Sequence, residues 1–122
     1  MMPPRLIVTI DCEDPIGLGS FWLAALGYET LDGDGEPLAW LVPPTGSMGP
    51  PVYLQRVPEP KSVKNRQHFD LAYDDTEEAI VRLEGLGARR LGEPYEQYGW
   101  WWQVMADPES NEFCVVKELS SS

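Results

Sequence analysis

The sequence is short of basic side chains. Its 122 residues include 9 lysines and arginines against 20 aspartates and glutamates, which gives a formal net charge of -11 at pH 7. A protein with this charge repels both the phosphate backbone of nucleic acids and the anionic headgroups of membranes. We therefore expect neither a nucleic acid nor a membrane as a partner.

Cysteine is scarce as well, and long apolar runs are missing. Cys12 and Cys114 are the only two cysteines, too few and too far apart for the disulfide framework of a small secreted protein. The first residues lack the apolar run of a signal peptide, and no later stretch is long enough to span a membrane. These absences predict a soluble, cytoplasmic protein.

The sequence does contain one pattern twice, about sixty residues apart. Residues 6–11 are rich in β-branched side chains and are followed by acidic residues and by an apolar stretch with helical spacing that stops at Gly27. Residues 68–73 begin the same succession, which stops at Gly87. A strand and a helix repeated in so short a chain predict two similar halves packed together.

Each predicted helix carries start signals. Asp14 can accept hydrogen bonds from the free N–H groups of the first helix, and Pro15 suits its first position. Asp75, with Glu78 three residues later, resembles a capping box for the second helix. Because glycine readily ends a helix, Gly27 and Gly87 predict where the two helices end.

Alternating apolar residues between turn signals predict the strands. The expected ranges are 5–11, 28–31, 38–42 and 51–57 in the first half, and 67–73, 89–91, 100–106 and 112–118 in the second. The fold class is therefore α+β, with two βαβββ repeats pairing into a cupped mixed sheet. We expect a single domain over 1–122, with half one at about 5–57, a connector at 58–65 and half two at about 66–118.

Several short motifs occur in the order and spacing of a known family. They are Asp14-Pro15, Phe21-Trp22, Leu26-Gly27-Tyr28, His68-Phe69-Asp70-Leu71 and the segment 106–113. In this respect the chain resembles the glyoxalase-like branch of the vicinal oxygen chelate superfamily, which includes glyoxalase I, bleomycin-resistance proteins and extradiol dioxygenases. The resemblance runs from about residue 5 to residue 117 and implies the pair of βαβββ halves.

In metal-dependent members, the resemblance implies a divalent ion held by side chains from the first and last strands of each half. His68 fits one such position, whereas Val8 takes the corresponding place in the first strand. Gln55 falls near the first-half carboxylate position, and Cys114 falls where the last strand usually offers glutamate. A hard divalent cation needs anionic oxygen or imidazole ligands, so we expect no metal and no other cofactor. His68 and Cys114 could hold zinc, but they leave its ligand set incomplete.

His68 and Cys114 also have ordinary interpretations. His68 alternates with Asp70 along its strand and is expected to face a cavity, where it could contact a ligand or act as an acid or base. The alternative is that it only hydrogen-bonds a neighbour such as Asp70 or Gln55. Cys114 is expected to be a small buried apolar residue, because a reactive thiol needs a nearby cation or helix start to lower its pKa.

Aromatic side chains are concentrated around residues 95–102, which contain three consecutive tryptophans. Neighbouring side chains in a strand point to opposite faces, so at least one of these rings should face the cavity or solvent. Trp40 and Tyr53 add aromatic surface in the first half. These rings favour a small apolar or planar ligand, although they could instead fill the core or cover a dimer contact.

The sequence thus predicts a metal-independent small-molecule-binding protein with an aromatic-lined cavity between its halves. The candidate ligand-binding residues are His68, Gln55, Cys114, Trp40, Tyr53 and Trp102. A metal-dependent lyase, isomerase or dioxygenase with a non-standard ligand set is one alternative, and a metal-free enzyme using His68 is another. A dimeric interaction protein without a ligand is the third, and the family resemblance itself favours a homodimer.

Overall fold

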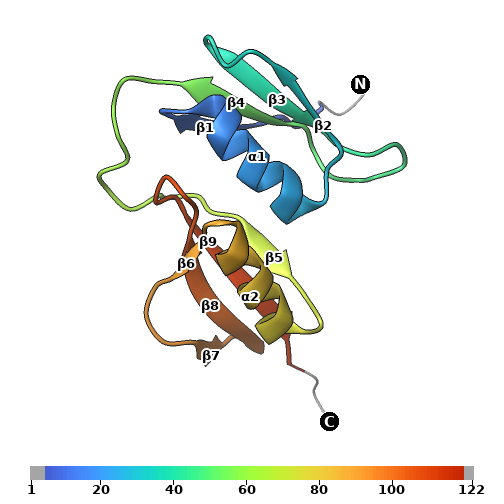
Figure 1. The fold of residues 1–122 in the computed structure, drawn as a ribbon. Helices are drawn as coiled ribbons and strands as arrows, with labels where there is room; N and C mark the ends of the chain where they lie inside the picture. The colour runs from blue at the N-terminus through green and yellow to red at the C-terminus, as the bar shows by residue number, and fades with distance from the viewer. Residues whose placement is uncertain (1–4, 120–122) are drawn as a thin grey trace. The chain divides into compact units, whose positions relative to one another are not determined.

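The structure, a computed structural model, describes residues 5–119. They form two compact units that divide between Lys61 and Ser62, and each unit combines a mixed β-sheet with a helix (Figure 1). The predicted α+β class and the repeated order of strand, helix and strands are confirmed. The single-domain organisation stays a prediction. Nowhere in residues 5–119 is a helix both long and apolar enough to cross a membrane.

The first unit contains a four-stranded sheet, called sheet 1 here, and one helix. The elements are β1 (Val8–Cys12), α1 (Pro15–Leu26), β2 (Thr30–Gly33), β3 (Leu38–Val42) and β4 (Val52–Arg56). The strand order is β1-β4-β3-β2, with β1 parallel to β4 and the other pairs antiparallel. A parallel pair needs a long connection between its strands, and α1 with the β2–β3 hairpin supplies it.

Helix α1 begins and ends where its capping residues predict. The Asp14 side chain accepts a hydrogen bond from the Gly17 backbone N–H at 3.1 Å, and Pro15 occupies the first turn. Gly27 ends the helix with φ 70°, a left-handed conformation that costs glycine little. The N–H of Tyr28 bonds back to α1, so β2 starts at Thr30 and not at residue 28 as expected.

One face of sheet 1 packs on α1 and forms the core of this unit. The helix buries Leu18, Phe21 and Trp22, and the sheet buries Ala39, Leu41, Val52 and Leu54. The burial of each leucine, valine or phenylalanine side chain in this core stabilises the fold by about 1.5–3 kcal/mol. Since side chains alternate along a strand, the residues between them point to the opposite face, called the far face of sheet 1 here.

The second unit contains sheet 2 and one helix. The elements are β5 (Asp70–Ala72), α2 (Thr76–Leu86), β6 (Arg89–Arg90), β7 (Tyr95–Gln97), β8 (Trp100–Ala106) and β9 (Glu112–Glu118). The strand order is β5-β9-β8-β6, with β7 also pairing with β8, and β5 lies parallel to β9. The predicted bounds of β8 and β9 agree with the structure.

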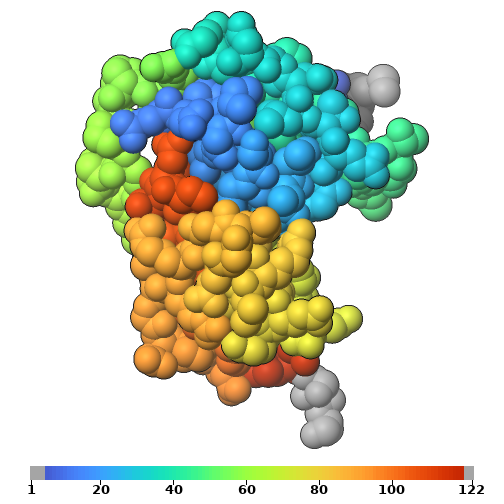
Figure 2. All heavy atoms as spheres, in the orientation of Figure 1, coloured from blue at the N-terminus to red at the C-terminus, as the bar shows by residue number. Residues whose placement is uncertain are grey.

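Helix α2 covers one face of sheet 2, and its atoms form much of the visible surface of this unit (Figure 2). The Asp75 side chain accepts a hydrogen bond from the Glu78 backbone N–H at 3.0 Å, as the capping box predicts. The helix buries Ala79, Ile80 and Leu83, and the facing sheet buries Met105, Phe113 and Val115. The other face is called the far face of sheet 2 here.

Strand β7 was not expected from the sequence. It pairs with β8 through a two-residue turn at Tyr98 and Gly99, whose φ values are 54° and 78°. Two consecutive positive φ values are typical of a type I′ hairpin turn, where asparagine, aspartate or glycine usually stands first. Tyr98 in that place hid the hairpin from sequence reasoning.

Strand β5 is shorter than the predicted range 67–73. His68 lies just before it, in a segment without regular structure, although the ladder extends slightly beyond the strand. The Cys114 N–H donates to the Phe69 carbonyl at 2.9 Å, and the Tyr73 N–H donates to the Val116 carbonyl at 3.0 Å. These bonds keep His68 close to the sheet.

Candidate functional site

The two halves can be compared position by position through their helix caps. The N-caps Asp14 and Asp75 are 61 positions apart, whereas the C-cap glycines are 60 apart because α2 is one residue shorter than α1. For residues that precede the helices, a position in the first half therefore corresponds to the position 61 residues later in the second half. The parallel registers agree, because Thr9 opposite Tyr53 matches Asp70 opposite Cys114.

This register corrects two expected correspondences. Val8 is opposite Val52, on the face that packs on α1, and its counterpart in the second half is Phe69. The counterpart of His68 is Ile7, which offers a metal ion no more than valine does. The counterpart of Cys114 is Tyr53, two residues before Gln55.

The far face of sheet 1 carries an aromatic pair. Trp40 of β3 and Tyr53 of β4 stand opposite each other in the antiparallel register, and both side chains are half-buried. Their rings stack with centroids 6.0 Å apart and planes inclined by 29°. An offset stack of this kind leaves a broad apolar surface on which a further planar ring can pack.

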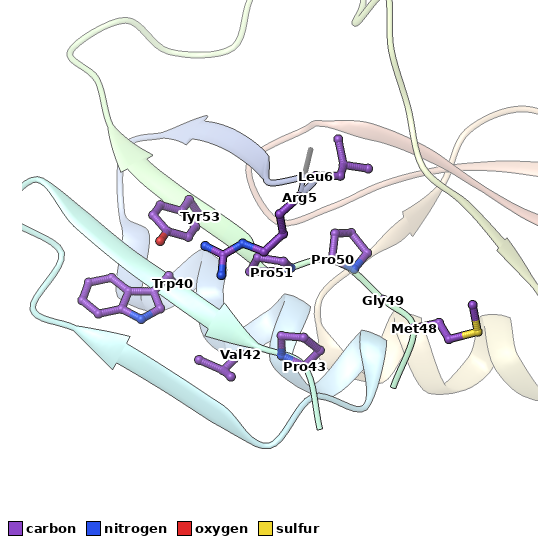
Figure 3. Close-up of a pocket in the computed structure, with 10 residues that line it drawn as sticks. All are labelled: Arg5, Leu6, Trp40, Val42, Pro43, Met48, Gly49, Pro50, Pro51 and Tyr53. Atoms are coloured by element: carbon purple, nitrogen blue, oxygen red, sulfur yellow. The ribbon is translucent and has the colours of Figure 1, made fainter. Parts of the chain in front are cut away.

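A groove of about 540 Å³ lies over this pair (Figure 3). Its walls come from the segment before β1, from the two strands and from the 43–51 loop: Arg5, Leu6, Trp40, Val42, Pro43, Met48, Gly49, Pro50, Pro51 and Tyr53. The Tyr28 hydroxyl donates to the Pro50 carbonyl at 2.7 Å, which holds the loop to the end of α1, and burial raises the pKa of Tyr28. Prolines in the loop further restrict its backbone.

Gln55 does not line this groove. Its side chain is exposed on β4, on the same far face as Tyr53, where it lies opposite Asp11 and Leu38. The alternation of side chains along β4 therefore places Gln55 on the same face as the groove, but further along the strand than the groove reaches.

The far face of sheet 2 carries a cluster of polar side chains. His68 Nε2 lies 3.2 Å from Asp70 Oδ1, and Asp70 stands opposite Cys114 across the β5–β9 pairing. The imidazole nitrogen, a carboxylate oxygen and the thiol sulfur all lie within 4.8 Å of one another. The His68 and Asp70 side chains are each 43% exposed, whereas Cys114 is only 6% exposed.

Electrostatics keep the Cys114 thiol protonated. Burial and the charge of Asp70 raise its pKa from the ordinary 9.0 to about 11, although Lys64 acts in the opposite direction. A thiol with so high a pKa is a poor nucleophile at neutral pH. Its burial also agrees with the expectation of a small apolar residue.

Trp102 lies further along the same far face of sheet 2. It stands opposite Val116, two positions from Cys114, and its ring stacks on Tyr95 of β7 with centroids 6.1 Å apart. Its indole N–H donates to the Gln97 carbonyl at 3.3 Å. Trp101 points to the other face of the sheet, as the alternation predicts.

The match to known proteins covers most of the chain. Residues 7–116 match the family described as the glyoxalase-like domain. The chain belongs to this family. The resemblance to the vicinal oxygen chelate superfamily is thereby confirmed. No protein of curated function matches this glyoxalase-like chain.

Solved structures share the glyoxalase-like fold. One is a glyoxalase/bleomycin resistance protein/dioxygenase family enzyme from Burkholderia phytofirmans PsJN, with 18% identity and a TM-score of 0.73 over 93% of this chain and 97% of that one. Another is a superfamily member from Sphaerobacter thermophilus DSM 20745, with 23% identity and a TM-score of 0.69 over 96% and 98%. A glyoxalase family protein from Bacillus cereus has 19% identity and a TM-score of 0.68 over 98% and 97%. At such identities the likeness concerns the fold alone.

The polar cluster offers more to a metal than the sequence indicated. Asp70 joins His68 and Cys114, so this glyoxalase-like chain presents three donors of different types. Imidazole, carboxylate and thiolate together suit zinc better than a hard cation, and three protein ligands with one open position are typical of catalytic zinc. Zinc in that place would polarise a substrate oxygen or lower the pKa of a bound water. The expected absence of a metal stays a prediction.

The structure groups the six predicted site residues only in part. Trp40 and Tyr53 share the groove in the first unit, and His68 and Cys114 share the cluster in the second, whereas Gln55 and Trp102 belong to neither. That all six line one cavity stays a prediction. Sequence reasoning missed Arg5 of the groove and gave Asp70 no ligand role, although the latter's i, i+2 spacing from His68 was visible.

Proposed function

We propose that the protein binds a small, planar, largely apolar molecule without the help of a metal. The observation that carries this proposal is the stacked Trp40–Tyr53 pair under the groove of sheet 1. Ligand sites are typically concave, mostly apolar and furnished with a few polar groups. The groove has this composition, since Arg5 is the only charged residue among the described residues that line it.

The expected affinity is modest. Covering about 200 Å² of apolar ligand surface at roughly 25 cal/mol per Å² gives about 5 kcal/mol before ordering costs. Stacking on an aromatic side chain adds about 1 kcal/mol, and since ordering costs weaken binding from there, we expect a dissociation constant no tighter than roughly 0.04 mM. A volume of about 540 Å³ leaves room for a two-ring compound.

A titration with the neutral planar probe naphthalene-2-carboxamide tests the proposal. The indole N–H signals in ¹H–¹⁵N NMR spectra distinguish the tryptophans once each has been assigned by substitution. We expect the Trp40 signal to move, Trp40→Leu to weaken binding about fivefold, and a chelator to change nothing. Trp101→Leu is the matched control, because Trp101 lies outside the groove. Probe binding that leaves Trp40 unchanged, or no binding at all, contradicts the proposal.

A second candidate function is a metal-dependent enzyme with a non-standard ligand set. It is favoured by one observation, the three donors His68, Asp70 and Cys114 within 4.8 Å. Addition of Zn²⁺ to untagged protein should then raise the melting temperature, since a ligand that binds the native state stabilises it. Co²⁺ should produce a thiolate-to-metal absorption band in the near ultraviolet.

Two variants test the ligands of this second candidate. Cys114→Ser should abolish the cobalt band, and Asp70→Asn should reduce the shift in melting temperature. The control Asp74→Asn removes an exposed carboxylate outside the cluster and should behave as the unsubstituted protein. Equal stabilisation of all forms by Zn²⁺ would place the ion elsewhere and remove this candidate.

A further inference from the structure

Within residues 5–119, the lining of the groove over the far face of sheet 1 has a single charged side chain. Nine of the ten residues in this part of the lining are apolar, aromatic, proline or glycine, and the tenth is Arg5. Arg5 lies in the segment just before β1, and its side chain extends toward Trp40 and Tyr53 (Figure 3). A guanidinium group thus accompanies the stacked rings.

Arg5 also lacks a partner of opposite charge among the described residues. Acidic side chains outnumber basic ones by 20 to 9, yet no carboxylate within residues 5–119 forms an ion pair with Arg5. By contrast, Arg56 pairs with Glu36, and Arg90 bridges Glu77 and Glu84. The donors of Arg5 are available to a group that enters the groove.

We propose that the groove selects planar aromatic monoanions, with a carboxylate as the preferred charged group. This inference rests on the proposed function, which it narrows to a ligand class. The rings of Trp40 and Tyr53 receive the planar part of the ligand, and the Arg5 guanidinium receives its carboxylate. The planar fork of arginine matches the two oxygens of a carboxylate through parallel hydrogen bonds.

The charge of the protein limits the ligand to one negative charge. A formal net charge of -11 makes the approach of each further negative charge less favourable, so phosphate esters and other polyanions are disfavoured. One guanidinium offsets one carboxylate. The groove of about 540 Å³ is also small for a nucleotide with several phosphates.

A matched pair of ligands tests this inference: naphthalene-2-carboxylate and its neutral amide, titrated at pH 7 with the indole signals as the readout. We expect the carboxylate to bind the unsubstituted protein about tenfold more tightly, which corresponds to about 1.4 kcal/mol. The preference should shrink at high salt, because Arg5 is exposed and its charge is screened.

Three variants assign the preference to Arg5. Arg5→Gln should make the two dissociation constants equal, chiefly by weakening the binding of the carboxylate. Arg5→Lys keeps the charge but loses the fork, so about threefold preference should remain. Arg66→Gln is the matched control, since it changes the net charge by the same amount and Arg66 lies outside the groove. Melting temperatures check that all variants are folded.

The outcomes separate the two proposals. Equal affinity of carboxylate and amide for the unsubstituted protein overturns the inference and leaves the proposed function standing. Loss of the preference in Arg66→Gln, or its survival in Arg5→Gln, also overturns it, because the anion would then be held elsewhere. Failure of both compounds to bind rejects the proposed function together with the inference.

Discussion

Asp70 stands directly opposite Cys114 where β5 pairs with β9, and its negative charge helps to keep that thiol protonated. The pair lies on the far face of sheet 2, beside His68. Because the carboxylate and the buried thiol influence each other, the stability of the protein should depend on the charge of Cys114.

The free energy of unfolding should fall as the pH rises from about 9 to about 11. Below pH 9 the thiol is protonated in both the folded and the unfolded chain, so it contributes no pH dependence. Above pH 9 the unfolded chain loses the proton, whereas the folded protein holds it until about pH 11, so deprotonation favours unfolding. Urea unfolding at successive pH values gives the measurement.

The control for this prediction is Cys114→Ala, which should flatten that part of the pH profile. Asp70→Asn should make the fall in the free energy of unfolding smaller, because one cause of the raised pKa of Cys114 is gone. A profile identical in the unsubstituted protein and in Cys114→Ala would show that other groups control alkaline stability.

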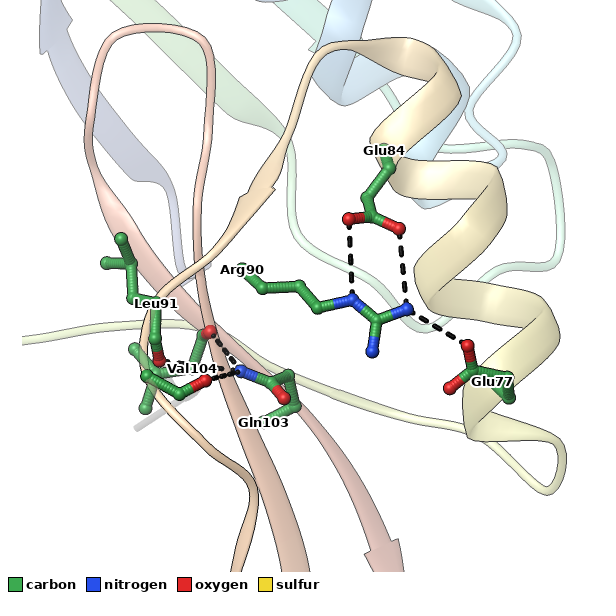
Figure 4. Close-up of polar contacts among 7 residues, drawn as sticks. Glu77, Glu84, Arg90, Leu91, Gln103 and Val104 are labelled. Atoms are coloured by element: carbon green, nitrogen blue, oxygen red, sulfur yellow. Dashed lines mark hydrogen bonds and ion pairs between the residues drawn. The ribbon is translucent and has the colours of Figure 1, made fainter.

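Gln103 is a buried polar residue that holds strand β8 to the chain after β6. Its side chain is 1% exposed, and its Nε2 donates to the carbonyls of Leu91, Gly92 and Val104 at 3.4, 3.1 and 2.9 Å (Figure 4). Replacing it by leucine removes this donor from the three partly buried hydrogen bonds and leaves none in its place. Gln103→Leu should therefore lower the free energy of unfolding by about 2 kcal/mol in urea titrations.

The matched control for Gln103 is Gln67→Leu, at an exposed position, where the change should be within about 0.5 kcal/mol. If the two leucine variants are equally stable, the three carbonyls find other partners and the interpretation is wrong.

Asp107 organises the turn between β8 and β9 from a fully buried position. Its Oδ1 accepts the N–H groups of Glu109 and Asn111 at 2.9 Å each, and its Oδ2 accepts from Asn111 Nδ2 at 2.9 Å. Asp107→Ala should cost about 3 kcal/mol, because several partly buried donors lose a charged acceptor. Asp107→Asn should cost less, since one acceptor oxygen remains. Thermal unfolding compares the melting temperatures of the two variants with that of the control Asp74→Ala, which removes an exposed carboxylate.

Arg90 of β6 forms exposed ion pairs with two glutamates of helix α2. It donates to Glu77 at 2.9 Å and to Glu84 at 3.3 Å (Figure 4), and these hydrogen bonds raise the pKa of Arg90. Exposed pairs contribute little and are screened by salt. Arg90→Ala should lower the melting temperature slightly at low salt, and the difference should vanish at about 1 M salt. A difference that persists at high salt would point to packing of the side chain and not to charge.

Local signals in the sequence predicted most of the fold. Asp14, Gly27, Asp75 and Gly87 limit the helices because capping depends on side chains and backbone within a few residues. The β7–β8 turn is also local, but Tyr98 adopts a positive φ that its residue type does not announce. Strand β2 began late because Tyr28 bonds to the preceding helix, a competition that strand propensity does not express.

The candidate sites were less predictable because they depend on register. Alternation correctly placed His68 beside Asp70, but only the pairing of β5 with β9 brings Cys114 to both. Similarly, the composition drew attention to Trp40 and Tyr53, and the β3–β4 register stacks them. Arg5 enters the groove from an irregular segment, whose path is set by tertiary contacts that no sequence period encodes.

The matching registers of β1 with β4 and of β5 with β9 have a consequence for the chemistry of the two halves. They make Tyr53 the counterpart of Cys114, so a phenol in one half stands where a thiol stands in the other. A role assigned to a residue in one half therefore cannot be transferred to the other half by position alone.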